Sequence, residues 1–187
     1  MRPIWVVYRR PLGMVERSLQ GCMPKLGAFL HCEVYCPDLM HDGAKGCTYT
    51  NFSACPMLKT RECLQSYSND RALYSYHMVE MDETQFETFT RWNDKQINNS
   101  CKYNYTDLLL QIVPFASTIA SEVDTSRSYH KSLYCSQAVI LALRASLNPD
   151  HKIVQALKGV VSRVSTPSSV SDLLSCVLGK PKPLPSI

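Results

Sequence analysis

Hydrophobic and polar positions alternate most clearly over residues 28–36, where every second side chain is small or apolar. Ala28, Leu30, Cys32, Val34 and Cys36 fall on one face of this segment, and Phe29, His31, Glu33 and Tyr35 fall on the other. Because successive side chains of a strand point to opposite faces, the pattern predicts a β-strand with its apolar face in the core. By the same alternation, we expect Cys32 and Cys36 to face away from the side that carries His31 and Glu33.

Three further segments are rich in β-branched and aromatic residues and are bounded by turn residues, which is typical of strands. They are residues 4–8, 47–52 and 72–81. We expect residues 47–52 to return along residues 28–36 as the second strand of an antiparallel hairpin. Turn residues at 37–38 (Pro-Asp) and 42–43 (Asp-Gly) predict a long loop between these two strands.

Apolar residues at helical spacing predict the helices. The expected helices cover residues 14–23, 82–97, 108–113, 132–145, 154–161 and 167–178, and residues 117–127 are expected to form a polar loop. A capping-box pattern begins at Asp82. The aliphatic segment 132–145 predicts a central buried helix capped by Ser132. The last helix is expected to start at Thr166-Pro167 and to end at Gly179.

Length and composition fit one folded domain of the α+β class. The chain has 187 residues, of which 45% are hydrophobic and 19% are charged, so a disordered chain is excluded. We expect one domain over residues 1–179 and a frayed, Pro-rich C-terminal tail over residues 180–187. The net charge is only +4 and the basic residues are scattered, which argues against nucleic acid as a partner.

Neither a signal peptide nor an apolar run long enough to span a bilayer is visible, so we expect a soluble, cytoplasmic protein without a transmembrane segment. In a reducing compartment, most of the nine cysteines are expected to be buried, reduced thiols. A zinc site is a weaker alternative because the spacings are irregular and no Cys-x-x-Cys occurs. Its ligands would come from Cys32, Cys36, Cys47, Cys55, Cys63, His31 and His41. We expect no metal and no cofactor.

Candidate chemistry centres on Cys135, which falls in the first turn of the predicted central helix. Unpaired backbone N–H groups at a helix start lower the pKa of a thiol and can stabilise an oxyanion. A thiolate nucleophile also needs a base and a group that orients the base, and His31 and Glu33 share one strand face. Each feature taken alone is more typical of a core cysteine or of a solvated strand face.

Two short motifs carry a family resemblance: Leu30-His31-Cys32-Glu33-Val34-Tyr35 and Tyr134-Cys135-Ser136-Gln137-Ala138-Val139. In this order they resemble the circularly permuted branch of the NlpC/P60 papain-like thiol hydrolases, in which the His strand precedes the Cys helix. That branch includes YiiX-type bacterial proteins, poxvirus and other large-virus members, and relatives of lecithin:retinol acyltransferase. The resemblance extends loosely over residues 4–178, with a lesser echo at Tyr103-Asn104-Tyr105. It implies a small antiparallel sheet packed on a central helix that bears the cysteine.

The resemblance implies Cys135 as nucleophile, His31 as base and Glu33 as the orienting group, with Asp38 or a residue of the returning strand as alternatives to Glu33. The implied activity is hydrolysis of a peptide, isopeptide or amide bond through an acyl-enzyme intermediate. An acyltransferase or lipid hydrolase acting on an acyl lipid is one alternative. A catalytically inactive viral protein that binds a host partner is another. The sequence does not indicate the oligomeric state.

Overall fold

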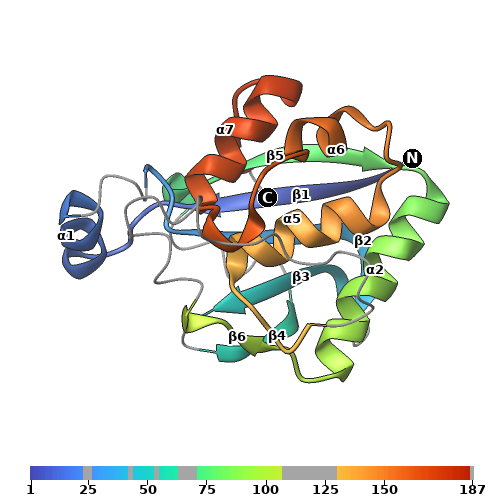
Figure 1. Cartoon of the computed structure of the whole chain (residues 1–187), viewed down its shortest axis with the longest axis horizontal. Coiled ribbons are helices and arrows are strands. Elements are labelled where there is room, and N and C mark those ends of the chain that lie inside the picture. The colour runs from blue at the N-terminus through green and yellow to red at the C-terminus, as the bar shows by residue number, and fades with distance from the viewer. Residues whose placement is uncertain (23–26, 42–43, 53–54, 63–70, 107–129, 186–187) are drawn as a thin grey trace.

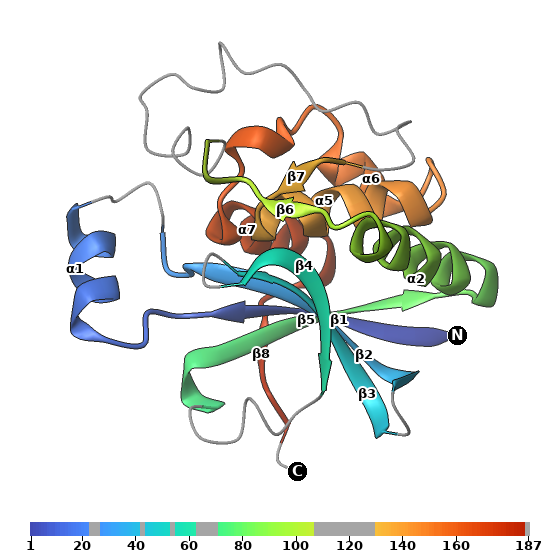
Figure 2. The same ribbon diagram turned by 90° about the horizontal axis from the view of Figure 1, so that it is seen from below.

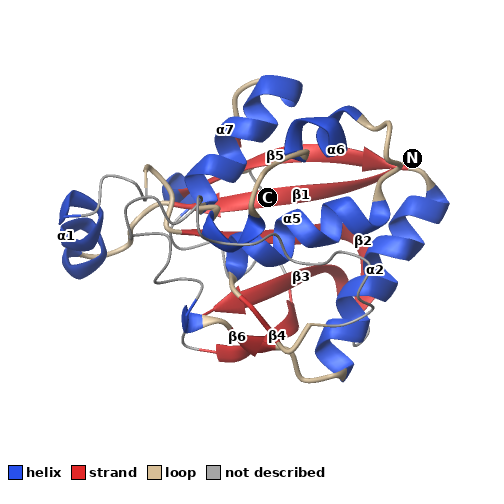
Figure 3. Cartoon of the chain, in the orientation of Figure 1, coloured by secondary structure: helices blue, strands red, loops and turns tan. Residues whose placement is uncertain are grey.

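The computed structural model describes residues 1–22, 27–41, 44–52, 55–62, 71–106 and 130–185 (Figure 1). The strands are β1 (Arg2–Arg9), β2 (His31–His41), β3 (Ala44–Phe52), β4 (Cys55–Glu62), β5 (Tyr74–Met81), β6 (Lys102–Tyr103), β7 (Ser132–Leu133) and β8 (Lys182–Pro183). The α-helices are α1 (Met14–Cys22), α2 (Glu83–Asn98), α5 (Cys135–Ser146), α6 (Lys152–Leu157) and α7 (Pro167–Leu178), with short 3-10 turns at Arg71–Leu73 and Ser162–Val164. Figure 3 separates the two classes by colour.

The strands form one sheet in the order β7-β6-β4-β3-β2-β1-β5-β8. Every pairing is antiparallel except that of β6 with β7. Helices α2, α5 and α7 lie together on one side of this sheet, whereas α1 stands apart at one end (Figure 2). A mixed α+β architecture is therefore confirmed, as are the strands predicted at residues 4–8, 47–52 and 72–81.

Strand β2 begins at His31, later than the predicted start at residue 28, and it runs past Pro37 and Asp38, which do not end it. The pairing register with β3 shifts between Cys36 and Met40, so the proline sits at an irregularity where its missing N–H interrupts no regular ladder. Only residues 42–43 separate the end of β2 from the start of β3. The predicted long loop is therefore wrong, although the predicted antiparallel hairpin is confirmed.

The core lies between the sheet and α5. Cys32, Val34 and Cys36 of β2 join the main hydrophobic cluster, as the alternation predicts. Every residue of α5 from Cys135 to Leu143 is buried, which confirms a central buried helix. Helices α2 and α7 pack on either side of α5 and explain why it is apolar on all faces.

Helix starts follow capping chemistry with one exception. Asp82 and Gln85 form the predicted capping box at the start of α2. The predicted start and end of α7 are also confirmed: the Thr166 side chain caps it, with proline next, and Gly179 ends it at a positive φ of 82°. The prediction that Ser132 caps α5 is wrong, because Ser132 belongs to β7 and Tyr134 is the N-cap.

Three other predictions concern residues 108–113, residues 117–127 and the C-terminal tail. The helix at 108–113 and the polar loop at 117–127 lie outside the described residues. The C-terminal tail is not wholly frayed, because β8 pairs with β5 and Leu184 packs on the outer face of the sheet. Among the residues described, no helix has both the length and the apolar character that a bilayer crossing requires.

Candidate active site

Cys135 is the first residue of α5, and its position is fixed by the buried segment around it. The chain enters the helix through β7 and an extended Tyr134, whose hydroxyl donates hydrogen bonds to the carbonyls of Ser162 (2.5 Å) and Ser165 (3.1 Å). The Ser136 hydroxyl donates to the same Ser165 carbonyl at 2.6 Å. These bonds hold the first turn of α5 rigidly, as precise placement of a nucleophile requires.

His31 and Glu33 lie at the start of β2 and form a buried pair. The distance from His31 Nε2 to Glu33 Oε2 is 3.2 Å, and the two side chains are 5% and 1% exposed. Thr50 on the neighbouring strand β3 places its hydroxyl 3.5 Å from the same imidazole nitrogen. Because water is nearly excluded, Glu33 both orients the ring and favours its charged form.

The structure brings His31 and Cys135 together in a hydrogen bond between their side chains. Burial opposes the charged imidazolium, but hydrogen bonds with Cys135 and Glu33 outweigh burial and raise the pKa of His31 to about 9. The pKa of Cys135 is lowered well below its usual range, by a hydrogen bond from the Cys32 thiol and by His31, against the opposing effect of burial. The pair therefore favours a thiolate with an imidazolium.

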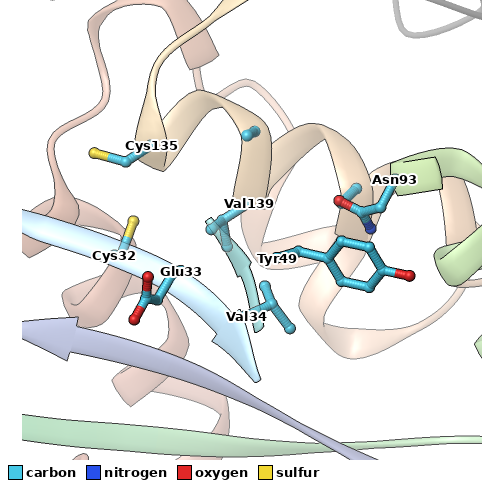
Figure 4. Close-up of a pocket in the computed structure, with 9 residues that line it drawn as sticks. Cys32, Glu33, Val34, Tyr49, Asn93, Cys135 and Val139 are labelled. Carbon is cyan, nitrogen blue, oxygen red and sulfur yellow. The ribbon is translucent and has the colours of Figure 1, made fainter. Parts of the chain in front are cut away.

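Cys32 is the main correction to the predicted site. It lines the same cavity as Cys135 and Glu33, and Figure 4 shows the Cys32 sulfur directed toward Cys135. Its backbone N–H also donates a hydrogen bond to the Cys135 sulfur. The expected alternation along β2 holds, but α5 packs on the apolar face. The prediction that Cys32 faces away from the site is therefore wrong.

Tyr103 is a site residue that the sequence reasoning did not assign. It is buried at the end of β6, which runs parallel to the β7 strand that leads into α5. Its hydroxyl donates a hydrogen bond to Cys135, and burial together with the Cys135 charge raises the pKa of Tyr103, which keeps the hydroxyl protonated. The Tyr103-Asn104-Tyr105 motif was the available signal, but nothing in it indicated contact with the nucleophile.

A small cavity lies beneath the nucleophile, between α5 and the sheet (Figure 4). Its lining residues are Cys32, Glu33, Val34, Tyr49, Asn93, Cys135, Ala138, Val139 and Ala142. It has room for about one water molecule. A substrate side chain does not fit there, so the substrate must approach Cys135 from another side.

Charged residues of β1 and α1 extend the site on the side of His31. Arg9 is the cross-strand partner of His31 and forms two hydrogen bonds with Glu16 of α1, at 2.8 and 3.0 Å. Glu16 also accepts from the backbone N–H of Leu12 at 2.7 Å. The charge of Arg9 acts on Glu33, and that of His31 acts on Glu16. Sequence reasoning missed this ion pair because its members come from different elements.

Of the alternatives to Glu33, the returning strand places Thr50 beside His31, whereas Asp38 does not join the site. Asp38 lies toward the other end of β2, where it pairs with Arg2 (3.9 Å) and Lys45 (3.3 Å), so the structure does not support it as the orienting group. Within the described part of the chain, no group of three or more His, Cys, Asp or Glu residues is arranged to hold a metal ion. Cys63 of the zinc alternative lies outside that part.

Comparison with models of protein families, with curated proteins and with solved structures finds no match. The chemistry of the site must therefore be inferred from its own geometry. That geometry joins a helix-start thiolate, an imidazolium and a buried carboxylate in one chain of hydrogen bonds.

Proposed function

We propose that the protein is a papain-like cysteine hydrolase that cleaves a peptide, isopeptide or amide bond through an acyl-enzyme intermediate. The observation that carries this proposal is the hydrogen-bonded series Cys135–His31–Glu33, buried and anchored on the start of α5 and the start of β2. The residue types and their contacts match what nucleophilic thiol catalysis needs: an activated sulfur, a base beside it and a third group that fixes the base.

In the first half of the reaction, the Cys135 thiolate attacks the carbonyl carbon of the substrate. The carbonyl oxygen gains negative charge, and donors beside the sulfur are available to it: the Tyr103 hydroxyl, the Cys32 backbone N–H and the backbone N–H groups of the first turn of α5. The His31 imidazolium then gives its proton to the leaving nitrogen, the C–N bond breaks, and an acyl thioester remains on Cys135.

In the second half, the now neutral His31 takes a proton from water, and the resulting hydroxide attacks the thioester carbonyl. The C–S bond breaks, a carboxylic acid leaves, and the proton on His31 restores the imidazolium beside the thiolate. Glu33 holds the ring throughout, with its Oε2 at 3.2 Å from Nε2.

The permuted papain-like fold is part of the same proposal. Two features support it: the histidine lies on a strand that precedes the cysteine helix in the chain, and that helix packs its first residue against the start of that strand. An antiparallel sheet with a buried helix on one face is the arrangement that the family resemblance implies.

One observation favours an acyl lipid as a second candidate substrate. The segment that leads into α1 and its first turn expose three apolar side chains, those of Leu12 (43%), Met14 (86%) and Val15 (76%). The Arg9–Glu16 ion pair ties this turn to the strand beside His31. Exposed apolar side chains in a turn that is tied to the strand carrying His31 suit a substrate with a hydrocarbon chain.

The test is alkylation of the reduced protein by iodoacetamide from pH 5 to pH 9, with each labelled cysteine located by mass spectrometry. We expect Cys135 to react fastest at pH 6 in the wild type, and His31→Ala to remove that preference. The exposed Cys176 serves as an internal control for reagent quality. Equal or slower labelling of Cys135 relative to Cys176 at pH 6 would reject the hydrolase and leave a protein that uses this fold for binding.

A further inference from the structure

We propose that Cys32 and Cys135 form a reversible disulfide when a peroxide oxidises the nucleophile, so that this pair is a redox modification site. The proposal rests on the proposed function only in requiring Cys135 to be a thiolate. It adds a covalent role for Cys32, whose part in the hydrolase mechanism is only to hydrogen-bond the Cys135 thiolate.

The geometry of the two sulfurs carries the proposal. Cys32 is the second residue of β2 and Cys135 the first of α5, and both line the cavity between the two elements. The Cys32 sulfur points toward Cys135 (Figure 4), and its thiol hydrogen-bonds to the Cys135 sulfur. This hydrogen bond places the two sulfurs side by side, and disulfide formation requires them to move from hydrogen-bonding to covalent distance.

The first chemical step consumes one peroxide. The Cys135 thiolate attacks one oxygen of hydrogen peroxide, the O–O bond breaks, and a sulfenic acid forms on Cys135. The departing hydroxide takes the proton of the His31 imidazolium and leaves as water. Sulfur is oxidised by two electrons and peroxide is reduced, and the site now holds an uncharged Cys135 beside a neutral His31.

The second step uses Cys32. Burial and the neighbouring Cys135 raise the pKa of Cys32, so its thiol stays protonated in the resting site and is not the first sulfur to react. Once Cys135 is a sulfenic acid, the neutral His31 accepts the Cys32 proton. The Cys32 sulfur then attacks Cys135, the S–O bond breaks, the hydroxyl leaves with that proton as water, and the disulfide forms.

A second cysteine pair in the same strand provides an internal control. Cys36 of β2 and Cys47 of β3 are direct cross-strand partners, and both are fully buried. Burial and the neighbouring Cys47 raise the pKa of Cys36. Among the strand pairings described, no histidine is a cross-strand partner of Cys36 or Cys47, so no imidazolium is paired with either thiol to favour the thiolate that the first step needs.

The experiment treats the reduced protein with hydrogen peroxide, blocks the remaining thiols with N-ethylmaleimide, and maps cysteines by non-reducing peptide mass spectrometry. In the wild type and in Cys36→Ala, we expect a linked peptide containing Cys32 and Cys135, which dithiothreitol removes. In Cys32→Ala and in the more conservative Cys32→Ser, we expect no link, and excess peroxide should carry Cys135 to an irreversible sulfinic acid.

Sulfinic acid on Cys135 of the wild type without a Cys32–Cys135 link would overturn the proposal, as would a link from Cys135 to any other cysteine. Either result can be read on the wild type alone, so it does not depend on whether the Cys32 variants fold. Iodoacetamide labelling of the same reduced sample at pH 6 separates the two proposals. Fast labelling of Cys135 without a disulfide rejects only the redox pair, whereas slow labelling rejects the proposed function.

Discussion

Strand β2 presents two cysteines to the core, and each meets a second cysteine: Cys32 meets Cys135 of α5, and Cys36 meets Cys47 of β3. Both pairs are buried from solvent. Yet the pKa of Cys135 is lowered well below its usual range, while burial and the neighbouring Cys47 raise that of Cys36. Cys32 and Cys36 are four residues apart on the same face of β2, yet the first contacts a reactive cysteine and the second contacts an unreactive one.

The difference comes from what surrounds each sulfur. Burial alone disfavours a thiolate, as at Cys36, where the neighbouring group is another thiol. At Cys135, four donors oppose burial: the Cys32 thiol, the Cys32 backbone N–H, His31 and the Tyr103 hydroxyl. The helix start adds the backbone N–H groups of the first turn. A buried cysteine becomes a nucleophile only where such donors converge.

Removing His31 should have the largest effect on the difference in reactivity between Cys135 and Cys36. In His31→Ala, Cys135 loses its charged partner and should behave as a buried thiol like Cys36. Because a thiol with a pKa near 8.5 is less than about 1% ionised at pH 6, we expect labelling of Cys135 there to fall by about 100-fold or more. Alkylation kinetics would measure this, and a rate within a factor of about 3 of the wild type would contradict it.

Glu33→Gln should lower the catalytic activity without abolishing it. The imidazolium loses its buried carboxylate, so the pKa of His31 should fall from its value of about 9. Because leaving-group protonation needs the imidazolium, kcat/KM of the wild type should decline as pH rises through about 9. The variant should lose activity roughly 10- to 100-fold, with this decline moved to lower pH. An unchanged pH profile would show that Glu33 does not act on His31.

Tyr103→Phe tests a smaller contribution to the stability of the Cys135 thiolate, and it changes the size of the side chain very little. It removes one hydroxyl donor to the Cys135 sulfur, and hydrogen bonds to charged groups are worth about 1.5–3 kcal/mol. We expect labelling of Cys135 at pH 6 to fall by roughly tenfold, with the pH dependence of labelling displaced upward. Tyr105→Phe is the matched control, because Tyr105 is half exposed and its ring packs 5.1 Å from that of Tyr103. Equal effects of the two variants would contradict a specific role for Tyr103.

Cys36→Ala should leave the reactivity of Cys135 unchanged. That result would show that the Cys32–Cys135 pair acts independently of the Cys36–Cys47 pair. Its sulfur fills core space, and its loss should lower the free energy of unfolding by about 1 kcal/mol, measured by urea denaturation. Labelling of Cys135 should match the wild type at every pH. A clear fall in that labelling would mean that the two cysteine pairs are coupled through β2.

Much of the candidate site could be predicted because its signals are local. The alternation along β2 identified His31 and Glu33, and the aliphatic run after Cys135 indicated a helix start. The position of Cys32 could not be predicted, because alternation tells which side chains share a face but not against which face a distant helix packs. Tyr103 was missed for the same reason, since its contact depends on the β6–β7 pairing.

The fold shows the same division between local and long-range information. The capping interactions of α2 and α7 involve residues close together in the sequence, and they could therefore be predicted. Strand β2 continues past Pro37 because its pairing with β3 tolerates an irregular register there, which the proline alone does not reveal. The parallel pairing of β6 with β7 joins segments far apart in the chain, so no short sequence motif predicts it.

The most direct test of the central claim is the ultraviolet thiolate absorbance of the reduced wild type minus that of Cys135→Ser, titrated from pH 5 to pH 9. We predict that the difference already equals one thiolate at pH 6, held there by the imidazolium of His31. A difference that stays at zero until the pH nears about 8.5, the ordinary pKa of a free thiol, would contradict it.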